Sequence, residues 1–180
     1  MILETIIMIV YTLALLLILM YALAQLNLLL NYLRSHRKNE KSPTFDLSDA
    51  EQIPYVTIQL PVYNELYVME RLLDNISKMD YPKGKLEIQV LDDSTDESFD
   101  STAIQIESLK RKGLDIQHVT RKDRKGFKAG ALKEGLKTAK GEYIAIFDAD
   151  FLPEKNWLYR TIPYFKDRNI GVVQTRWGHI

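Results

Sequence analysis

Two carboxylates, Asp148 and Asp150, follow directly after an apolar, β-favouring run at residues 143–147. Such a run is typical of a buried parallel strand, and an open α/β sheet binds its ligands at the carboxyl ends of such strands. In an extended segment, side chains at this spacing point to the same side of the chain. Two such oxygen ligands favour a bound Mg²⁺ or Mn²⁺, whose shell a phosphate would complete. We therefore predict a metal and phosphate site; two acids in a surface turn are the alternative.

Two other predicted strands also end in polar clusters. Residues 55–60 run into residues 61–65 (Pro-Val-Tyr-Asn-Glu), and residues 86–91 run into residues 92–94 (Asp-Asp-Ser). The carboxyl ends of parallel strands lie on one edge of a sheet, so we expect both clusters beside the aspartate pair. One acidic loop is ordinary solvated surface, whereas three polar clusters on a single edge indicate a site.

A basic loop after the predicted strand 115–119 supplies the opposite charge. Its cations are Arg121, Lys122, Arg124, Lys125 and Lys128. Acids, bases and a metal together suit a nucleotide diphosphate, because cations neutralise the phosphates and carboxylates accept hydrogen bonds from the base or ribose. Gly126 and Gly130 would permit close backbone approach. The alternative is a solvated run; Lys128, which begins a predicted helix, is the favoured phosphate contact.

Composition excludes several other classes of function. The chain has 24 basic and 24 acidic residues, which indicates no nucleic acid partner. It has no cysteine, which excludes disulfides, zinc–thiolate sites and a cysteine nucleophile. Neither the P-loop motif nor the dinucleotide-binding glycine motif is present.

The elements that must position these residues alternate along the chain. Predicted strands at 55–60, 86–91, 115–119, 143–147 and 170–174 are separated by predicted helices, of which the last two cover 128–138 and 157–165. This order predicts βαβ units and a mostly parallel α/β sheet with flanking helices. Asn64 is expected to cap the first of these helices, and Ser94 with Glu97 has the spacing of a capping box for the second.

The amino-terminal segment predicts a membrane anchor. Residues 1–33 are almost entirely apolar, and about 20 apolar helical residues span a bilayer. A cleaved signal peptide would have a basic start, whereas this segment carries Glu4 and no Lys or Arg. We predict a transmembrane helix at 1–33, a basic linker at 34–53 and a cytoplasmic domain at 54–180, in a plasma or Golgi-type membrane.

The motifs together resemble inverting family 2 glycosyltransferases, and most closely cellulose-synthase-like enzymes of the mannan or glucomannan synthase type. The matching segments, in the order of the family, are residues 61–65, 90–96, 128–132, 147–150 and 173–177. The resemblance covers about residues 54–180. It implies a GT-A (Rossmann-like) fold, a nucleotide-diphosphate sugar as donor, a divalent metal, and a glycan or lipid acceptor.

The resemblance also implies roles for single residues. The donor-binding residues would be Pro61, Tyr63, Glu65, Asp92, Asp93, Lys128 and Asp148, the metal ligands Asp148 and Asp150, and the acceptor-side residues Gln174, Arg176 and Trp177. Asp92 would contact the base, Lys128 would lie near the diphosphate or ribose, and Asp150 would be the direct metal ligand.

The sequence departs from the family in one respect. The catalytic carboxylate of a Thr-Glu-Asp-like motif and the later Gln-x-x-Arg-Trp motif are missing, and residues 174–177 are one residue too short and too early to replace the latter. We therefore expect an amino-terminal piece that holds the donor half and is inactive in isolation, with the base beyond Ile180. The complete enzyme would transfer a hexose from UDP-glucose or GDP-mannose with inversion.

Two alternatives remain at this point. A haloacid-dehalogenase-type phosphatase has its aspartate pair after the first strand of the domain, followed by Gly and Thr. Here the pair follows the fourth predicted strand and precedes Phe-Leu-Pro. The other alternative is a membrane-tethered protein that binds sugar nucleotide or partners a synthase subunit without turnover.

Overall fold

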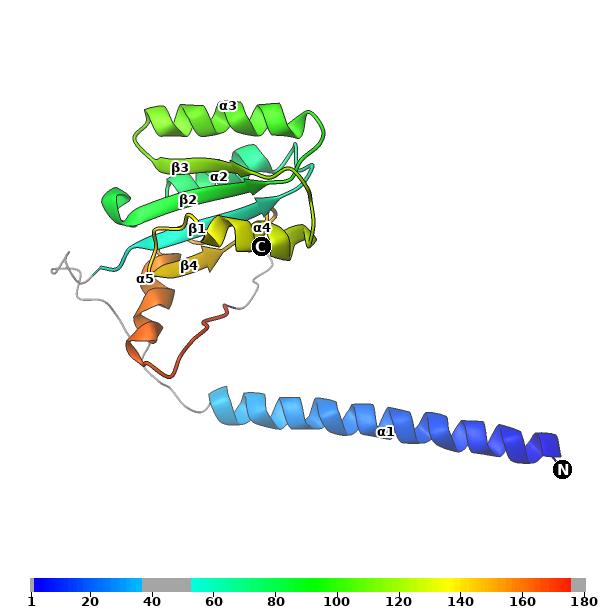
Figure 1. Cartoon of the computed structure of the whole chain (residues 1–180). Helices are drawn as coiled ribbons and strands as arrows, with labels where there is room; N and C mark the ends of the chain where they lie inside the picture. Colours follow the sequence, from blue (N-terminus) through cyan, green and yellow to red (C-terminus); the bar gives the residue numbers. More distant parts are fainter. Residues whose placement is uncertain (1, 37–52, 176–180) are drawn as a thin grey trace. The chain divides into compact units, whose positions relative to one another are not determined.

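The computed structural model describes residues 2–36 and 53–175 (Figure 1). The chain divides into two units, Met1–Lys41 and Ser42–Ile180. The first unit contains α1 (Ile2–His36), which continues three residues past the predicted end of the membrane helix. Its span Ile2–Arg34, which contains an 18-residue window with a mean hydropathy of 2.7, is long and apolar enough to cross a membrane. A signal sequence meets the same criterion, so α1 is a candidate span. Most of the predicted linker at 34–53 lies outside the described residues.

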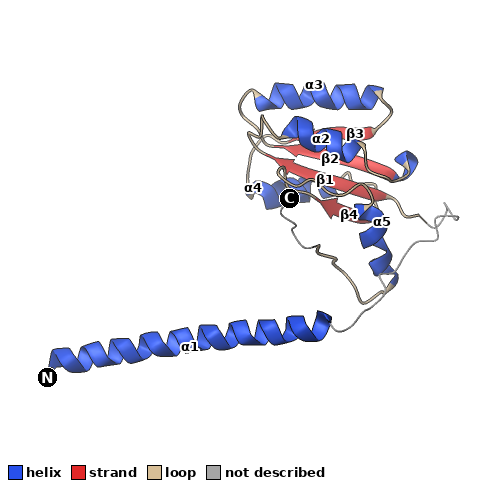
Figure 2. Cartoon of the chain, turned by 180° about the vertical axis from the view of Figure 1, so that it is seen from behind, coloured by secondary structure: helices blue, strands red, loops and turns tan. Residues whose placement is uncertain are grey.

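The second unit is built on a four-stranded parallel sheet (Figure 2). Its strands are β1 (Val56–Val62), β2 (Leu86–Asp92), β3 (Asp115–Thr120) and β4 (Tyr143–Ile146), in the order β3-β2-β1-β4. The connecting helices are α2 (Met69–Ser77), α3 (Ser98–Arg111), α4 (Phe127–Leu136) and α5 (Trp157–Thr161), with 3₁₀ turns η2 (Lys83–Lys85) and η3 (Ile162–Lys166). The predicted α/β class with a parallel sheet and flanking helices is confirmed.

The predicted fifth strand at residues 170–174 is wrong. These residues are irregular, and a cavity of about 440 Å³ lies between them and β4, lined by Ile144 and Ile146 on one side and Val172 and Val173 on the other. The separation leaves them without a ladder partner, and Val172 is 81% exposed. Within the described sheet β4 is therefore an edge strand, not the buried strand that its composition suggested.

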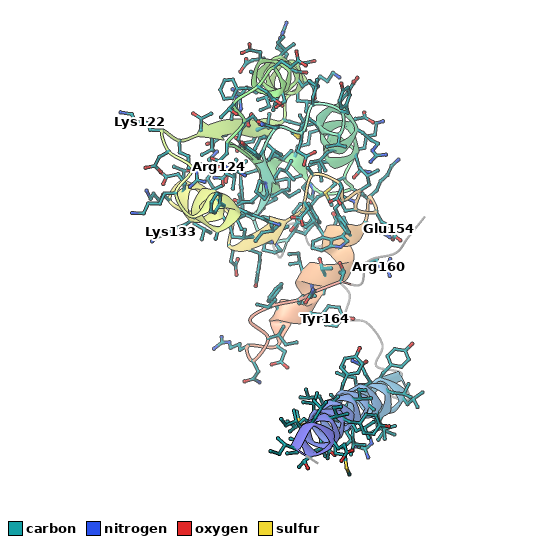
Figure 3. The ribbon with its side chains drawn as sticks, turned by 90° about the vertical axis from the view of Figure 1, so that its right-hand side faces the viewer. Lys122, Arg124, Lys133, Glu154, Arg160 and Tyr164 are labelled. Carbon is teal, nitrogen blue, oxygen red and sulfur yellow. The ribbon has the colours of Figure 1, made fainter. Side chains whose placement is uncertain are left out.

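The two faces of the sheet differ in polarity because side chains alternate along each strand. On one face Val56, Ile58 and Leu60 are fully buried in a core shared with α2 and α3. Helix α2 contributes Met69, Leu72, Leu73 and Ile76 at helical spacing, all buried. Figure 3 shows the sheet between α2 on one side and α4 on the other. Each fully buried apolar side chain contributes about 1.5–3 kcal/mol.

The face toward α4 carries a buried polar layer instead. Glu87 is 0% exposed, and its carboxylate accepts hydrogen bonds from Thr57 Oγ1 (2.7 Å), Gln117 Nε2 (2.9 Å) and the Lys140 backbone N–H (2.9 Å). These bonds offset the large cost of burying a carboxylate. They also hold the connection between α4 and β4 against the sheet, and so fix the two elements that carry Lys128 and lead into Asp148.

Helix α4 can approach this layer because Gly135 faces it. A Cβ at that position would lie 2.6 Å from Gln59 Nε2 and 2.8 Å from Gln89 Oε1, and these two glutamines are themselves hydrogen-bonded at 3.0 Å. A larger residue would push the helix off the sheet. The glycine thus sets the height of α4 above the strands.

The two predicted helix caps are wrong. Helix α2 begins at Met69, and Asn64 instead has a φ of 56°, which asparagine tolerates better than most residues. Asn64 donates its N–H to Ser94 Oγ (2.9 Å) and accepts the Thr95 N–H (3.0 Å). At the start of α3, Asp96 Oδ1 accepts the Ser98 N–H (3.0 Å). Asn64 and Ser94 therefore tie two loops together rather than starting helices.

Candidate active site

A cavity of about 430 Å³ opens where β1, β2 and β4 end. It is lined by Pro61, Val62, Tyr63, Glu65, Asp93, Arg124, Lys128, Ala131, Asp148, Ala149 and Asp150. The predicted meeting of three strand ends at one edge is confirmed, because each of the three clusters contributes to this one cavity. The ligands of these residues remain predictions.

Asp148 and Lys128 both line the cavity and form an ion pair. Lys128 Nζ donates to Asp148 Oδ1, and the two side chains are 52% and 42% exposed. The segment after Asp148 is a turn, in which the Phe151 N–H donates to the Asp148 carbonyl at 3.0 Å. The extended geometry predicted for Asp148 and Asp150 is therefore wrong, although the turn still leaves both residues on the cavity.

The two aspartates suit a metal ion whose coordination shell is completed by a bound ligand. Asp148 already has a cationic partner, whereas no side chain or backbone group of the described residues bonds the Asp150 carboxylate. Within residues 2–36 and 53–175, no group of three or more His, Cys, Asp or Glu could hold a metal. Mg²⁺ in nucleotide sites commonly uses only one or two carboxylates, with phosphate oxygens and water completing its shell. The residues present fit that arrangement.

Asp93 is held by a bidentate ion pair at the rim of the cavity. Arg121 Nε donates to Asp93 Oδ1 at 2.6 Å and Nη2 donates to Oδ2 at 2.5 Å. The hydrogen bond to Asp93 raises the pKa of Arg121 above its ordinary value. The same guanidinium donates to the carbonyls of Lys125 (2.7 Å) and Phe127 (2.8 Å). Arg121 therefore fixes the basic loop to the end of β2.

Gly130 explains the close fit of this loop. A Cβ on Gly130 would lie 2.1 Å from the Lys125 carbonyl oxygen and 2.4 Å from Arg121 Nη1. Gly126 has a φ of 77°, in the region that favours glycine. The backbone that Gly130 admits is that of the loop itself, and the approach of a nucleotide to Gly126 and Gly130 stays a prediction.

Asp92 does not line the cavity. It is 3% exposed, accepts the Ser94 N–H at 2.9 Å and lies 2.8 Å from His118 Nε2. Burial acts to raise the pKa of Asp92, but the hydrogen bonds from His118 and Ser94 lower it below its ordinary value. Asp92 therefore lies behind the cavity wall, on the same face of β2 as Ile88 and Val90. Alternation along β2 was the sequence signal for this placement.

The basic loop divides between two surfaces. Arg124 and Lys128 line the cavity, whereas Lys122 and Lys125 line an outer groove together with Lys133. Figure 3 shows Lys122 and Lys133 pointing away from the domain. No feature of the sequence separates Arg124 from its basic neighbours, so its place beside Tyr63 was not predicted.

The acceptor-side residues are only partly described. Gln174 lines the cavity of about 440 Å³, which shares Lys128 and Asp148 with the first cavity. Arg176 and Trp177 lie outside the described residues. The structure therefore brings Gln174 to a cavity that Asp148 also lines and leaves the other two predictions open.

The sequence matches the model of glycosyl transferase family 2 over residues 57–180. The chain belongs to this family. It is 47% identical over 134 residues to probable glucomannan 4-beta-mannosyltransferase 7 of Oryza sativa subsp. japonica, covering 72% of this chain and 23% of the relative. It is 36% identical over 168 residues to glucomannan 4-beta-mannosyltransferase 1 of Cyamopsis tetragonoloba, covering 88% and 32%. The family 2 chain thus spans less than a third of the length of either relative.

Solved structures show the same fold. The mannosyltransferase PcManGT from Pyrobaculum calidifontis, in complex with GDP-Man and Mn²⁺, has a TM-score of 0.63 and 36% identity, covering 79% of this chain and 41% of that one. TarS 1-349 of S. aureus has a TM-score of 0.50 and 28% identity, covering 58% and 30%. The predicted GT-A-like fold and family 2 glycosyltransferase class are confirmed, and the phosphatase alternative is wrong.

Proposed function

We propose that the cavity of about 430 Å³ is the donor site of a mannosyltransferase that uses GDP-mannose. The observation that carries this proposal is the convergence of Tyr63, Asp93, Lys128 and the aspartate pair on one cavity at the carboxyl edge of the sheet. The similarity to a mannosyltransferase in complex with GDP-Man and Mn²⁺ supports the choice of donor. UDP-glucose is the competing donor.

Each wall of the cavity would hold one part of the donor. Tyr63 offers an aromatic face to the base, beside the carboxylates of Glu65 and Asp93, which can accept hydrogen bonds from base N–H groups or ribose hydroxyls. Lys128 is positioned to leave Asp148 for a phosphate oxygen, because both groups are about half exposed and can exchange partners. Asp92 supports this wall from behind and does not touch the donor.

Asp150 and Asp148 would hold Mg²⁺ or Mn²⁺ together with the diphosphate. When bound, the metal would offset the negative charge that develops on the leaving diphosphate. Lys128 would add a positive charge beside the same phosphates. These side chains would therefore stabilise the leaving diphosphate and would not activate the acceptor hydroxyl.

The reaction that we propose is a direct displacement. A hydroxyl of a glycan or lipid acceptor attacks the anomeric carbon, the bond from that carbon to the diphosphate oxygen breaks, and GDP leaves with inversion. The proton of the acceptor hydroxyl passes to a general base. We assign that base to none of the described residues, because the carboxylates of the cavity are placed for the donor.

We further propose that α1 anchors the protein in a membrane and that the glycosyltransferase unit faces the cytoplasm. The length and apolarity of α1 support the anchor, and the cations from Arg34 onward support the orientation, because positive charge is retained on the cytoplasmic side.

Donor titration of the full chain in detergent tests the proposal. By calorimetry, GDP-mannose should bind more tightly with Mn²⁺ than without it, and more tightly than UDP-glucose. Asp150→Asn should abolish the Mn²⁺ dependence, whereas the matched variant Asp100→Asn, an exposed position on α3, should retain it. Equal metal dependence in Asp150→Asn would refute the ligand assignment. Release of GDP or transfer of mannose by this chain would argue against the non-catalytic alternative.

A further inference from the structure

Arg124 covers an aromatic face that the proposed donor would need. Its Cζ lies over the Tyr63 ring, 3.2 Å from the ring centroid, so the guanidinium covers that face of the ring. Tyr63 and Arg124 both line the cavity, and Tyr63 is 38% exposed. The ring is therefore already stacked in the free protein, with a side chain of the protein itself as the stacking partner.

The contacts of Arg124 are weak in comparison with those of its neighbour Arg121. Its other contacts are Asp93 Oδ2 at 3.9 Å and the Phe127 ring at 5.3 Å, whereas Arg121 makes four hydrogen bonds of 2.5–2.8 Å. The side chain of Arg124 is 38% exposed and that of Arg121 is 13% exposed. Arg121 thus fixes the loop backbone, and Arg124 can leave the ring by rotation of its side chain alone.

A guanidinium and a nucleobase compete for the same kind of surface. Both are flat, and both stack on aromatic rings at similar distances. We propose that Arg124 occupies the base-stacking face of Tyr63 in the free protein and has to leave this face before the nucleoside of the donor binds. This inference rests on the proposed function, because it takes the cavity to be a nucleoside site.

Loss of Arg124 should have the opposite effect to loss of an arginine that binds the base. Removal of a competing side chain strengthens the binding of an uncharged nucleoside, whereas removal of a stacking partner weakens it. Because cation–π and long ion-pair contacts at an exposed site are weak, we expect a gain of about three- to tenfold in affinity. Uncharged nucleosides are the appropriate probe, since loss of the positive charge would itself weaken the binding of a diphosphate.

The experiment compares Arg124→Ala with Lys122→Ala in the full chain in detergent, using guanosine and uridine as ligands. Lys122 is exposed in the same loop and lines the outer groove instead of the cavity, so its loss removes one charge without uncovering Tyr63. Arg124→Ala should bind nucleoside about three- to tenfold more tightly than the wild type, and Lys122→Ala should match the wild type. Unchanged or weaker binding by Arg124→Ala would overturn the inference.

Side-chain NMR gives a second measurement that does not depend on the size of the affinity change. The Nε–Hε signal of Arg124, assigned by its loss in Arg124→Lys, should be shifted upfield by the Tyr63 ring in the free protein and should move toward its ordinary position on nucleoside binding. A signal that stays shifted in the nucleoside complex would overturn the inference while leaving the proposed donor site intact. If neither the wild type nor Arg124→Ala binds nucleoside, the proposed donor site fails, and the inference fails with it.

Discussion

The charged residues around the cavity form two regions with opposite environments. The frame, which comprises Glu87, Asp92 and Arg121, is buried or nearly so, and each of its members makes at least two hydrogen bonds. The open wall, which comprises Arg124, Lys128, Asp148 and Asp150, is more exposed and has few partners. Charge alone does not distinguish the two regions, whereas burial and hydrogen bonding do.

This difference has a physical basis. A buried carboxylate costs much free energy unless several donors bond it, so a residue that has collected such donors is committed to the folded structure. An exposed carboxylate or ammonium costs little and can exchange its partner for a ligand. We therefore expect substitutions in the frame to change stability and substitutions in the open wall to change binding.

The largest effect is expected at Glu87. In Glu87→Gln one carboxylate oxygen becomes an NH₂ group that cannot accept, so the side chain loses either the bond from Gln117 Nε2 at Oε1 or the bonds from Thr57 Oγ1 and the Lys140 N–H at Oε2. We expect a loss of about 2–4 kcal/mol in the free energy of unfolding. Urea denaturation followed by tryptophan fluorescence measures it.

The control for this prediction is Glu154→Gln. Glu154 pairs with Arg160 on the surface, where both side chains are mostly exposed (Figure 3), so its loss should leave the denaturation midpoint unchanged. Equal midpoints for the two variants would show that the frame has no special role in stability.

A smaller and pH-dependent effect is expected at Asp92. Because the pKa of Asp92 is lowered in the folded protein, its ionised form stabilises the fold above its unfolded pKa of about 4, and this stabilisation is lost as the pH falls below that value. Asp92→Asn should cost about 1–2 kcal/mol at pH 7. The difference from the wild type should shrink below pH 4 in denaturation experiments. A difference that is constant from pH 7 to pH 3 would contradict this account.

Asp92 also shows which features of the fold and the site could be predicted from the sequence. The alternation of strands and helices, and the polar clusters at the strand ends, were enough to predict the parallel sheet and the cavity edge. Asp92 was grouped with Asp93 because both are acidic and adjacent. The pleat of β2 separates them, since residues two apart share a face and Asp92 falls with Ile88 and Val90.

Other features depend on contacts that a linear pattern does not contain. Residues 170–174 have the composition of a strand, but strand formation requires a neighbour within hydrogen-bonding distance, and a cavity lies between them and β4. The stacking of Arg124 on Tyr63 depends on the loop path that Arg121 and Gly130 enforce. The family relationship could be recognised from motifs, whereas the division into frame and open wall depends on burial and hydrogen bonds that arise only in the folded chain.

The smallest effect on the stability of the fold is expected at Lys128. This residue of the open wall should change ligand binding instead. Lys128→Ala removes one exposed ion pair with Asp148, so the denaturation midpoint should not change. The affinity for GDP should fall by about tenfold, because a charge-assisted hydrogen bond to phosphate contributes about 1.5 kcal/mol or more. The affinity for guanosine should stay the same, since guanosine has no phosphate for Lys128 to contact.

Lys133→Ala is the matched control, because Lys133 lies on the same helix but points away from the domain (Figure 3). An equal loss of affinity for GDP and guanosine in Lys128→Ala would show that Lys128 supports the shape of the cavity, and would move it from the open wall to the frame.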